Sequence, residues 1–224
     1  MKPSTSPIKR QTVTASVTEL IRGRIIAGEY PGGFQIRQEA IADELGVSRI
    51  PVREALVQLE GEGLVVIHTH RGAVVAPLNE ADAVDIFEAR LLLEPFMIEL
   101  AIGNATDEDI GKVRQCMSAY AAELGRGASP AVLSALNWSF HEALTQPADR
   151  PRTLTIIASL YNAADRYLRL QINDDTAKAR AVAGHEAIAE AFAKRDAPLA
   201  KALLKKHIAD AHRDVIEDLR KAGM

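Results

Sequence analysis

Four polar residues in the second half of the chain have the types and the spacing of a metal-binding set. Asn137 and His141 lie four residues apart in a helical pattern, so both side chains can point from one helix face into the same cavity. His185 and His207 follow on two later predicted helices. Three imidazoles and one oxygen donor suit zinc or another first-row divalent ion. A single helical histidine is more often an ordinary surface, capping or core residue, so spacing alone leaves both interpretations open.

A second group, near residue 50, has the pattern of a nucleic-acid-binding helix. Ser48 is a good N-cap, and Arg49 and Arg53 lie four residues apart on one helix face. Val52 and Leu56 turn to the opposite face. A helix that enters the major groove of DNA needs short polar residues and arginines at its N-terminal end, where base edges and phosphates are within reach. The pattern therefore indicates a polar reading face backed by a core face.

The segment after this helix adds a candidate contact for the minor groove. Two β-branched runs predict a hairpin, and Arg71 lies beside Gly72 at its tip, where glycine lets the backbone approach phosphate closely. The alternative is that the arginines of the helix only solvate it, paired with Glu54 or Glu60. We favour DNA binding because helix, turn, helix and hairpin follow one another within about 40 residues.

These arginines need a scaffold, and the pattern of residues 13–77 predicts a winged helix-turn-helix domain. The apolar spacing is helical from Val13 until Gly28, and a short link at Gly46 joins two further helices. The predicted elements are helices over residues 13–28, 38–45 and 48–61, and strands over residues 64–67 and 73–76. Residues 1–12 have no apolar period to bury and are expected to form a flexible arm.

Beyond Pro77 the strand signals vanish, and residues 78–224 read as a second, all-α domain. Alanine-rich helical segments follow one another, and Thr106 with Asp109 has the spacing of a capping box. The predicted helices lie near residues 80–103, 106–125, 130–145, 151–171, 176–194 and 197–221. The fold class is therefore mainly α, with three helices and a small β-hairpin in the N-terminal domain.

Composition excludes several classes of protein. The chain has 224 residues, of which 47% are hydrophobic and 25% charged, and this balance excludes a disordered or collagen-like chain. No apolar run approaches the roughly 18 residues needed to cross a bilayer, and residues 1–16 lack a hydrophobic signal core. We expect a cytoplasmic protein without a membrane partner. The net charge of −3 does not by itself indicate a nucleic-acid binder, so the local placement of the arginines must decide.

The N-terminal part resembles the GntR-type winged-helix transcription regulators over about residues 17–76. Residues 26–32 read IAGEYPG, residues 40–56 read AIADELGVSRIPVREAL, and residues 71–75 read RGAVV. The resemblance implies that Arg49 and Arg53 contact operator bases or phosphates and that the wing around Gly72 enters the minor groove. Many relatives carry arginine where this chain has Glu39. Arg37 lies close by in this sequence and completes the candidate DNA contacts.

The second part resembles the FCD ligand-binding domain of the FadR-type branch over about residues 80–218. The segments on which this resemblance rests are residues 137–144, 184–188 and 200–208, which read NWSFHEAL, GHEAI and AKALLKKHI. The resemblance implies an antiparallel helical bundle that holds a metal ion, with zinc as the first choice. Asn137 stands where aspartate is common. Its neutral oxygen is a weaker donor, which lowers the expected metal affinity and leaves direct effector contacts as a second role for the set.

Arginines of the second domain are candidates for binding an acidic effector. Arg90 matches the first helix of the FCD domain, where an arginine often faces the cavity and could hold a carboxylate. The alternative is an intrahelical pair of Arg90 with Glu94. Arg166 and Arg169 are weaker candidates for the same role. His68, His70 and His212 are expected to be surface residues.

Together these features predict a DNA-binding transcriptional regulator, with repression favoured, that is controlled by a small organic or sugar acid. A homodimer would place two recognition helices on an inverted-repeat operator. One alternative is a metal-dependent hydrolase that uses the three histidines, although Glu142 and Glu186 each adjoin a ligand and point about 100° away from it. Another alternative is a helical scaffold that binds protein.

Overall fold

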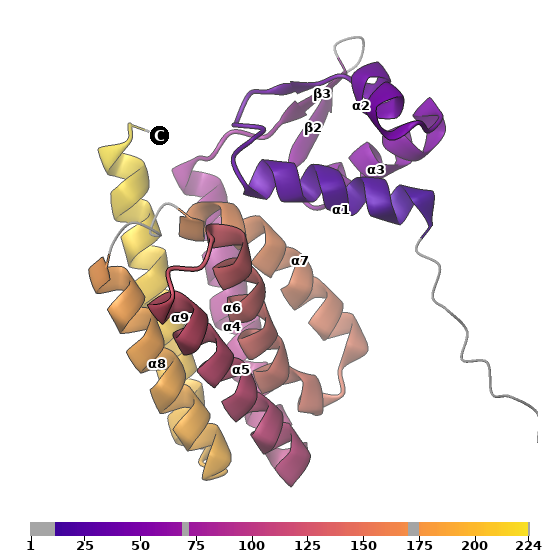
Figure 1. Ribbon diagram of the computed structural model, residues 1–224. Coiled ribbons are helices and arrows are strands. Elements are labelled where there is room, and N and C mark those ends of the chain that lie inside the picture. The colour runs from indigo at the N-terminus through magenta and orange to yellow at the C-terminus, as the bar shows by residue number, and fades with distance from the viewer. Residues whose placement is uncertain (1–11, 69–71, 170–174, 224) are drawn as a thin grey trace, which may run out of the picture. The chain divides into compact units, whose positions relative to one another are not determined.

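The computed structural model describes residues 12–68, 72–169 and 175–223 (Figure 1). The chain divides into two compact units, residues 1–77 and residues 78–224. Apart from Thr12, the predicted N-terminal arm lies outside the described residues, as does Arg71. The fold class predicted from the sequence, mainly α with an N-terminal winged helix-turn-helix, is confirmed.

In its described residues, 12–68 and 72–77, the first unit holds three helices and a three-stranded antiparallel sheet. The helices are α1 (Val13–Ile26), α2 (Gln38–Leu45) and α3 (Arg49–Gly61), and the strands are β1 (Gln35–Ile36), β2 (Val65–His68) and β3 (Gly72–Val75). The strand order is β1-β3-β2, and the predicted hairpin pairs Val65 with Val75 and His68 with Gly72. Strand β1 was not predicted, because two residues are too few to show an alternating pattern.

The turn between α2 and α3 follows from glycine and proline chemistry. Gly46 ends α2 in the left-handed conformation, with φ at 64°, which an L side chain adopts only at a cost. Ser48 then takes the extended N-cap position of α3. Pro51 lies within the first turn of α3, where a missing amide donor costs nothing. The turn therefore fixes where the exposed arginines of α3 begin.

Helix α1 holds α3 in place through apolar and polar contacts. Val17 and Ile21 of α1 pack with Val52, Leu56 and Leu59 of α3 in one core in which each is at most 2% exposed. On the flank of this core, three residues of α1 spaced four apart each hydrogen-bond the residue 40 positions later. The pairs are Thr14–Glu54, Thr18–Gln58 and Arg22–Glu62.

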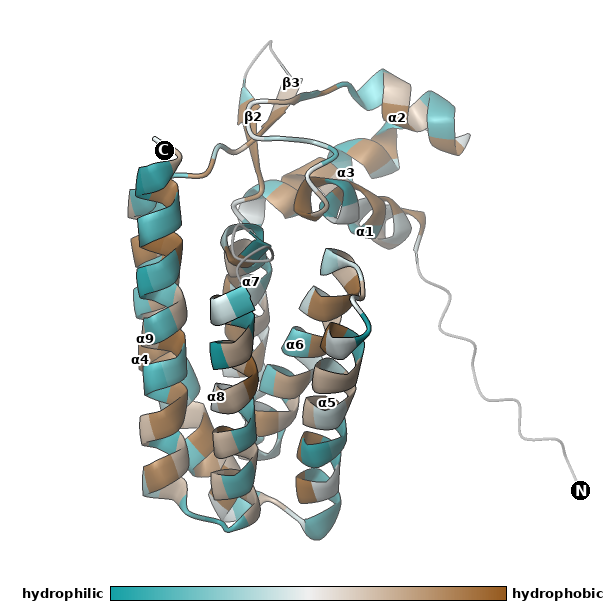
Figure 2. Cartoon of the chain, turned by 60° about the vertical axis from the view of Figure 1, so that its left-hand side comes forward, coloured by the Kyte–Doolittle hydropathy of each residue, from teal (hydrophilic) through white to brown (hydrophobic). Residues whose placement is uncertain are grey.

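The second unit is all-helical within the described residues. Its elements are α4 (Glu80–Asn104), α5 (Asp107–Gly125), α6 (Pro130–Thr145), the short 3-10 helix η1 (Gln146–Ala148), α7 (Pro151–Leu168), α8 (Asp175–Ala193) and α9 (Ala197–Lys221). Helix α4 packs against α7 and α9, while α5 packs against α6 and α8. The long helices carry both hydrophilic and hydrophobic residues (Figure 2), as amphipathic helices do.

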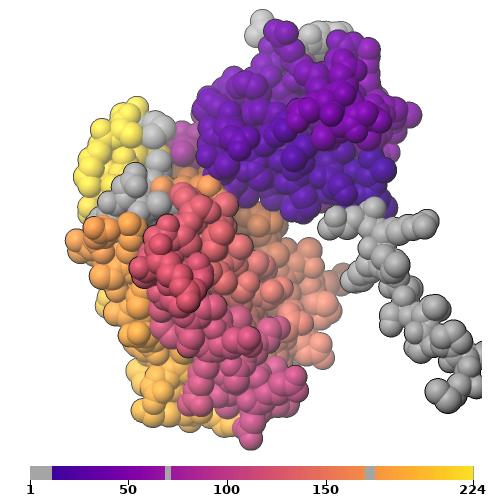
Figure 3. All heavy atoms as spheres, in the orientation of Figure 1, coloured from indigo at the N-terminus to yellow at the C-terminus, as the bar shows by residue number. Residues whose placement is uncertain are grey.

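Side chains fill the spaces between these helix ribbons (Figure 3). The largest fully buried ones include Phe87, Phe140, Tyr161, Tyr167 and Phe192. At the start of α5, Thr106 and Asp109 form the predicted capping box, in which each side chain accepts a hydrogen bond from the backbone of the other. No helix in the described part of the chain combines the length and the apolar character that a membrane span requires.

Candidate metal centre and DNA-binding surface

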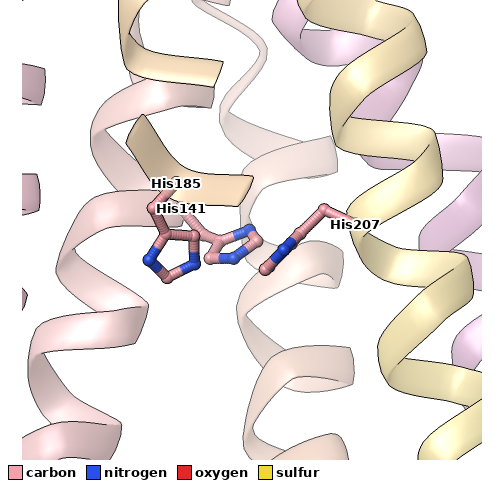
Figure 4. Close-up of side chains that lie close together, drawn as sticks. All are labelled: His141, His185 and His207. Atoms are coloured by element: carbon pink, nitrogen blue, oxygen red, sulfur yellow. The ribbon is translucent and has the colours of Figure 1, made fainter. Parts of the chain in front are cut away.

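Three histidines from α6, α8 and α9 meet in the interior of the second unit (Figure 4). One ring nitrogen from each of His141, His185 and His207 lies within 4.8 Å of the others. His141 is 2% exposed and His185 is fully buried. The structure therefore brings together the three imidazoles that the sequence analysis singled out.

The surroundings of His185 indicate whether this cluster fits a metal ion. Both of its ring nitrogens are buried without a hydrogen-bond partner among the described residues. Burial, followed by repulsion from His207 and His141, lowers the pKa of His185 well below its usual value, which favours the neutral form of the ring. Burial and His141 likewise lower the pKa of His207 to about 3. An unpartnered buried polar atom is costly, and a neutral imidazole is the form that binds a divalent metal, so the donor set fits such an ion.

Close packing of α8 on α9 positions the third imidazole. A Cβ atom on Gly184 would lie 2.9 Å from Nδ1 of His207, a distance that side chains do not tolerate. Glycine at this position therefore lets the His207 ring lie directly against the backbone of α8. Because His185 follows Gly184, the same stretch of helix supplies one ligand and makes room for another.

Glu94, predicted only as a possible partner of Arg90, also contacts one of the clustered histidines. Its Oε2 lies 3.0 Å from Nδ1 of His141, and its Oε1 accepts a 2.6 Å hydrogen bond from Nε of Arg90. Burial opposes ionisation of Glu94, but the charge of Arg90 and the contact with His141 outweigh it and lower the pKa of Glu94 to about 2. An ionised Glu94 can accept a hydrogen bond from Nδ1–H of His141. In that tautomer Nε2 carries the lone pair that could bind a metal ion.

Arg90 takes part in the intrahelical pair and also reaches the cavity. Its guanidinium carbon lies 5.0 Å from the ring centre of Tyr161 and 5.3 Å from that of Phe87. The side chain is 2% exposed and forms part of a cavity wall together with His141 and His207. Only its Nε atom has a hydrogen-bond partner within the described part of the chain. The two interpretations of Arg90 are therefore compatible.

The cavity beside the histidines has a volume of about 110 Å³. Asn137 lies in its wall, and the amide nitrogen of Asn137 donates a hydrogen bond to the hydroxyl of Tyr161, which leaves the amide oxygen for another partner. Arg169 also lines the cavity and pairs with Asp165 at 3.3 Å. Arg166 is buried elsewhere and is not part of the cavity wall, and burial lowers its pKa.

The remaining histidines differ from one another. His68 is exposed, as expected, and His70 lies outside the described residues. The prediction for His212 was wrong, because this residue is partly buried and its ring stacks on Phe87 with 5.2 Å between ring centres. Sequence periodicity could not show this, because the stacking partner lies on another helix.

The predicted reading face of α3 is exposed. Ser48, Arg49 and Arg53 are all exposed at the start of the helix. Arg49 forms an ion pair with Glu39 of α2, although 69% of its side chain remains exposed, and does not pair with the acidic residues of its own helix. Arg53 has no partner in the described ranges. The two cations are therefore accessible to a polyanion.

The other candidate contacts lie on α2 and the wing. Arg37 is exposed at the N-cap of α2. Gly72 opens β3 opposite His68 with φ at 79°, a conformation that favours glycine at this end of the hairpin.

Two protein-family models match this chain. A family model described as "Bacterial regulatory proteins, gntR family" matches residues 13–75, and one described as "FCD domain" matches residues 85–210. The chain belongs to the gntR family of bacterial regulatory proteins. Within that family it carries a C-terminal FCD domain, and the FCD match contains all three clustered histidines.

Relatives of this gntR-family chain align over most of its length. A probable D-xylose utilization operon transcriptional repressor of Paenarthrobacter nicotinovorans is 29% identical over 209 residues, which cover 93% of this chain and 91% of the relative. The Uxu operon transcriptional regulator of Escherichia coli (strain K12) is 28% identical over 237 residues, which cover 97% of this chain and 91% of the relative.

Solved structures of similar fold include E. coli McbR/YncC, with a TM-score of 0.81 and 17% identity. That match covers 93% of this gntR-family chain and 99% of the other. A putative transcriptional regulator GntR from Rhodococcus sp. RHA1 has a TM-score of 0.78 at 21% identity, with 91% and 97% covered. At these identities the likeness establishes the fold alone.

Proposed function

We propose that this protein is a DNA-binding transcriptional regulator, acting as a repressor, whose operator affinity is controlled by a small organic or sugar acid bound in the FCD domain. The observation that carries the proposal is the exposed pair Arg49 and Arg53 at the start of α3, backed by a buried apolar face. The names of two relatives, a D-xylose utilization operon repressor and the Uxu operon regulator, favour a sugar-derived acid.

The proposed DNA contacts come from Arg37, Ser48, Arg49, Arg53 and Gly72. Arg71, which lies outside the described residues, was predicted from the sequence as a further contact beside Gly72. Phosphate contacts from arginines supply affinity, and base contacts from the start of α3 supply specificity. In a homodimer, two such helices would bind the two halves of an inverted repeat.

The regulatory part of the proposal uses His141, His185 and His207, with Asn137 as an oxygen donor, to hold a divalent ion, for which zinc is the first choice. Such an ion would attract the carboxylate oxygens of the effector. Arg90 would hold a carboxylate through the terminal nitrogens of its guanidinium group, while Nε keeps its bond to Glu94. Arg166 is the weaker candidate, since Arg169 rather than Arg166 reaches this cavity.

A metal-dependent hydrolase is the second candidate function, because three histidines could also activate water. Glu142 and Glu186, the acidic residues beside two of the ligands, are exposed. Glu94 is buried next to His141, but its carboxylate is already engaged by His141 and Arg90, and its low pKa makes it a weak base. These observations favour a sensor over a hydrolase, and a turnover screen on the zinc-loaded protein separates the two.

A ligand screen tests the regulatory part. Sugar acids and short carboxylic acids are added to the protein with and without EDTA, and the melting temperature is recorded. We expect at least one acid to raise the melting temperature of the metal-loaded protein, because a bound ligand stabilises by mass action, and to change its affinity for duplex DNA. If no acid shifts the metal-loaded protein, the effector assignment of the cavity is wrong.

A further inference from the structure

The candidate metal centre contains no negatively charged ligand of its own. Within the described residues, the cluster of metal-binding side chains consists of His141, His185 and His207 without an aspartate or glutamate. The oxygen donor beside them is the amide of Asn137, which is neutral. A divalent ion on this set would therefore keep its full double charge.

The nearby carboxylates are already engaged. Glu94 uses one oxygen to accept from Arg90 and the other to contact His141, so its charge compensates the arginine. Asp165 lines the cavity but contacts Arg169 at 3.3 Å and accepts a hydrogen bond from Ser134. Neither carboxylate is free to neutralise an ion held by the histidines.

The cations that line the cavity wall are each paired with a carboxylate, so the wall offers no unpaired negative charge to an ion. Arg90, Arg169 and Lys178 all line the cavity, against Asp165 as the acidic lining residue. Lys178 also contacts Asp175 at 2.9 Å. A divalent ion transferred from water into this setting exchanges its hydration for neutral nitrogen and oxygen donors, and an anionic ligand would add the charge attraction that these donors do not provide. An anion entering alone would lack the strongest attraction that the site can offer.

We propose that the divalent ion and the carboxylate of the effector bind this cavity cooperatively, the carboxylate being the negatively charged ligand that the chain does not provide. The inference rests on the proposed function and deepens it. The effector is then a small acid whose oxygens contact both the ion and Arg90, since both positions border one cavity. Cooperativity is reciprocal: the acid tightens the ion, and the ion tightens the acid by the same factor.

Calorimetric titration of the full-length protein, stripped with EDTA and dialysed, tests the coupling. Zinc is titrated alone and then in the presence of acetate, a carboxylate that chelates zinc only weakly. We expect acetate to lower the dissociation constant of zinc by about tenfold, within the usual range of coupling between sites. Identical zinc affinity with and without acetate would overturn the proposal.

Asn137→Asp places the missing charge on the chain and is nearly isosteric. We expect this variant to bind zinc tightly without acetate and to show a reduced effect of acetate. Ala135→Asp is the matched control, because it adds the same charge at an exposed position of the same helix and should behave as wild type. A melting curve of each variant verifies folding. The titration of the wild-type protein with and without acetate tests the proposal even if a variant fails to fold.

The outcomes also separate this inference from the proposed function. Tight zinc binding that ignores acetate and is unchanged in Asn137→Asp contradicts the coupling but leaves a metal-assisted effector site intact. Zinc that binds neither the wild-type protein nor Asn137→Asp, with or without acetate, overturns both. Loss of zinc binding in His141→Ala assigns the measured affinity to this cluster.

Discussion

Glu94 links a cation of α4 to an imidazole of α6, and each of its carboxylate oxygens has one partner. Arg90, Glu94 and His141 are all at most 2% exposed, so the three groups depend on one another for charge and hydrogen bonding. Removing the charge of Glu94 would leave a buried guanidinium without its counter-ion.

We predict that Glu94→Gln lowers the free energy of unfolding by about 3 to 5 kcal/mol, the usual cost of breaking a buried ion pair. Glu99→Gln on the same helix is the control, because Glu99 is 45% exposed and its pair with Lys201 is worth at most about 1 kcal/mol. Urea denaturation measures the free energy of unfolding of both variants. An equal decrease in the two would show that the buried pair of Glu94 with Arg90 stabilises the fold no more than the exposed pair does.

Glu39 is the second residue whose role is visible only in three dimensions. It holds Arg49, one of the two arginines proposed to bind DNA, in an exposed ion pair between α2 and α3. A duplex must compete with this pair and also approach the negative charge of Glu39 itself.

We therefore expect Glu39→Gln to raise the affinity for duplex DNA roughly two- to fivefold, since an exposed pair is worth less than about 1 kcal/mol. Fluorescence anisotropy at fixed salt measures the change, with the exposed Glu108→Gln of the second unit as control. Weaker binding by Glu39→Gln would mean that Glu39 orients Arg49 for DNA rather than restraining it.

At the level of elements, the approach of α8 to α9 is set by one glycine. Replacing a helical glycine by alanine normally stabilises by about 0.5 to 1 kcal/mol. At Gly184 the added methyl group would lie 2.9 Å from His207, whereas at Gly111 of α5 nothing lies within 4 Å.

The two substitutions should thus have opposite effects. Gly111→Ala is expected to raise the melting temperature, while Gly184→Ala is expected to lower it and to weaken the stabilisation by zinc, because the His207 ring must move. Thermal melts with and without zinc test both. A Gly184→Ala variant with wild-type zinc response would show that the position of the His207 ring is not critical.

The start of α5 provides a pH-dependent element. Hydrogen bonds from the backbone and the hydroxyl of Thr106 lower the pKa of Asp109 below its ordinary value of 3.8. The stabilisation by the ionised carboxylate is therefore complete above that ordinary value and is lost as the pH falls through the lowered pKa.

Asp109→Asn should consequently be less stable than wild type by about 0.5 to 1 kcal/mol at pH 7, and the difference should shrink below pH of about 3.8. Denaturation at pH 7 and at low pH measures it. Asp107→Asn, whose side chain is 99% exposed in the same helical turn, is the control and should show a smaller effect. A difference that persists undiminished in acid would exclude the charge of Asp109 as its source.

The helices could be predicted closely because their ends carry local signals. Gly46, Ser48 and Pro51 fix the boundary of α2 and α3 within a few residues, and Thr106 with Asp109 marks the start of α5. Strand β1 has no such signal, because its two residues exist as a strand only through pairing with β3. Local chemistry thus determines the helix ends, while sheet pairing requires the folded chain.

At the scale of the whole molecule, the candidate site depends on contacts between distant segments. The three histidines were candidates by residue type and by resemblance, but only the packing of α6, α8 and α9 brings them together. Glu94 lies 47 residues from His141, and no periodicity within one helix indicates that contact. Residue chemistry could therefore propose the metal ligands but not the carboxylate that orients one of them.

The proposed regulatory function requires that the protein bind an operator. The exposed arginines at the start of α3 are the residues at which this binding can be tested. A duplex selected by the wild-type protein from a random-sequence pool is titrated with the wild-type protein, Arg53→Ala and the control Arg126→Ala, whose exposed arginine lies in the second unit. We predict salt-dependent binding and a loss of about tenfold or more in Arg53→Ala, as expected for a base or phosphate contact, with Arg126→Ala unchanged. Wild-type affinity in a folded Arg53→Ala protein, or a pool from which no duplex can be selected, would contradict the proposed docking of α3 on DNA.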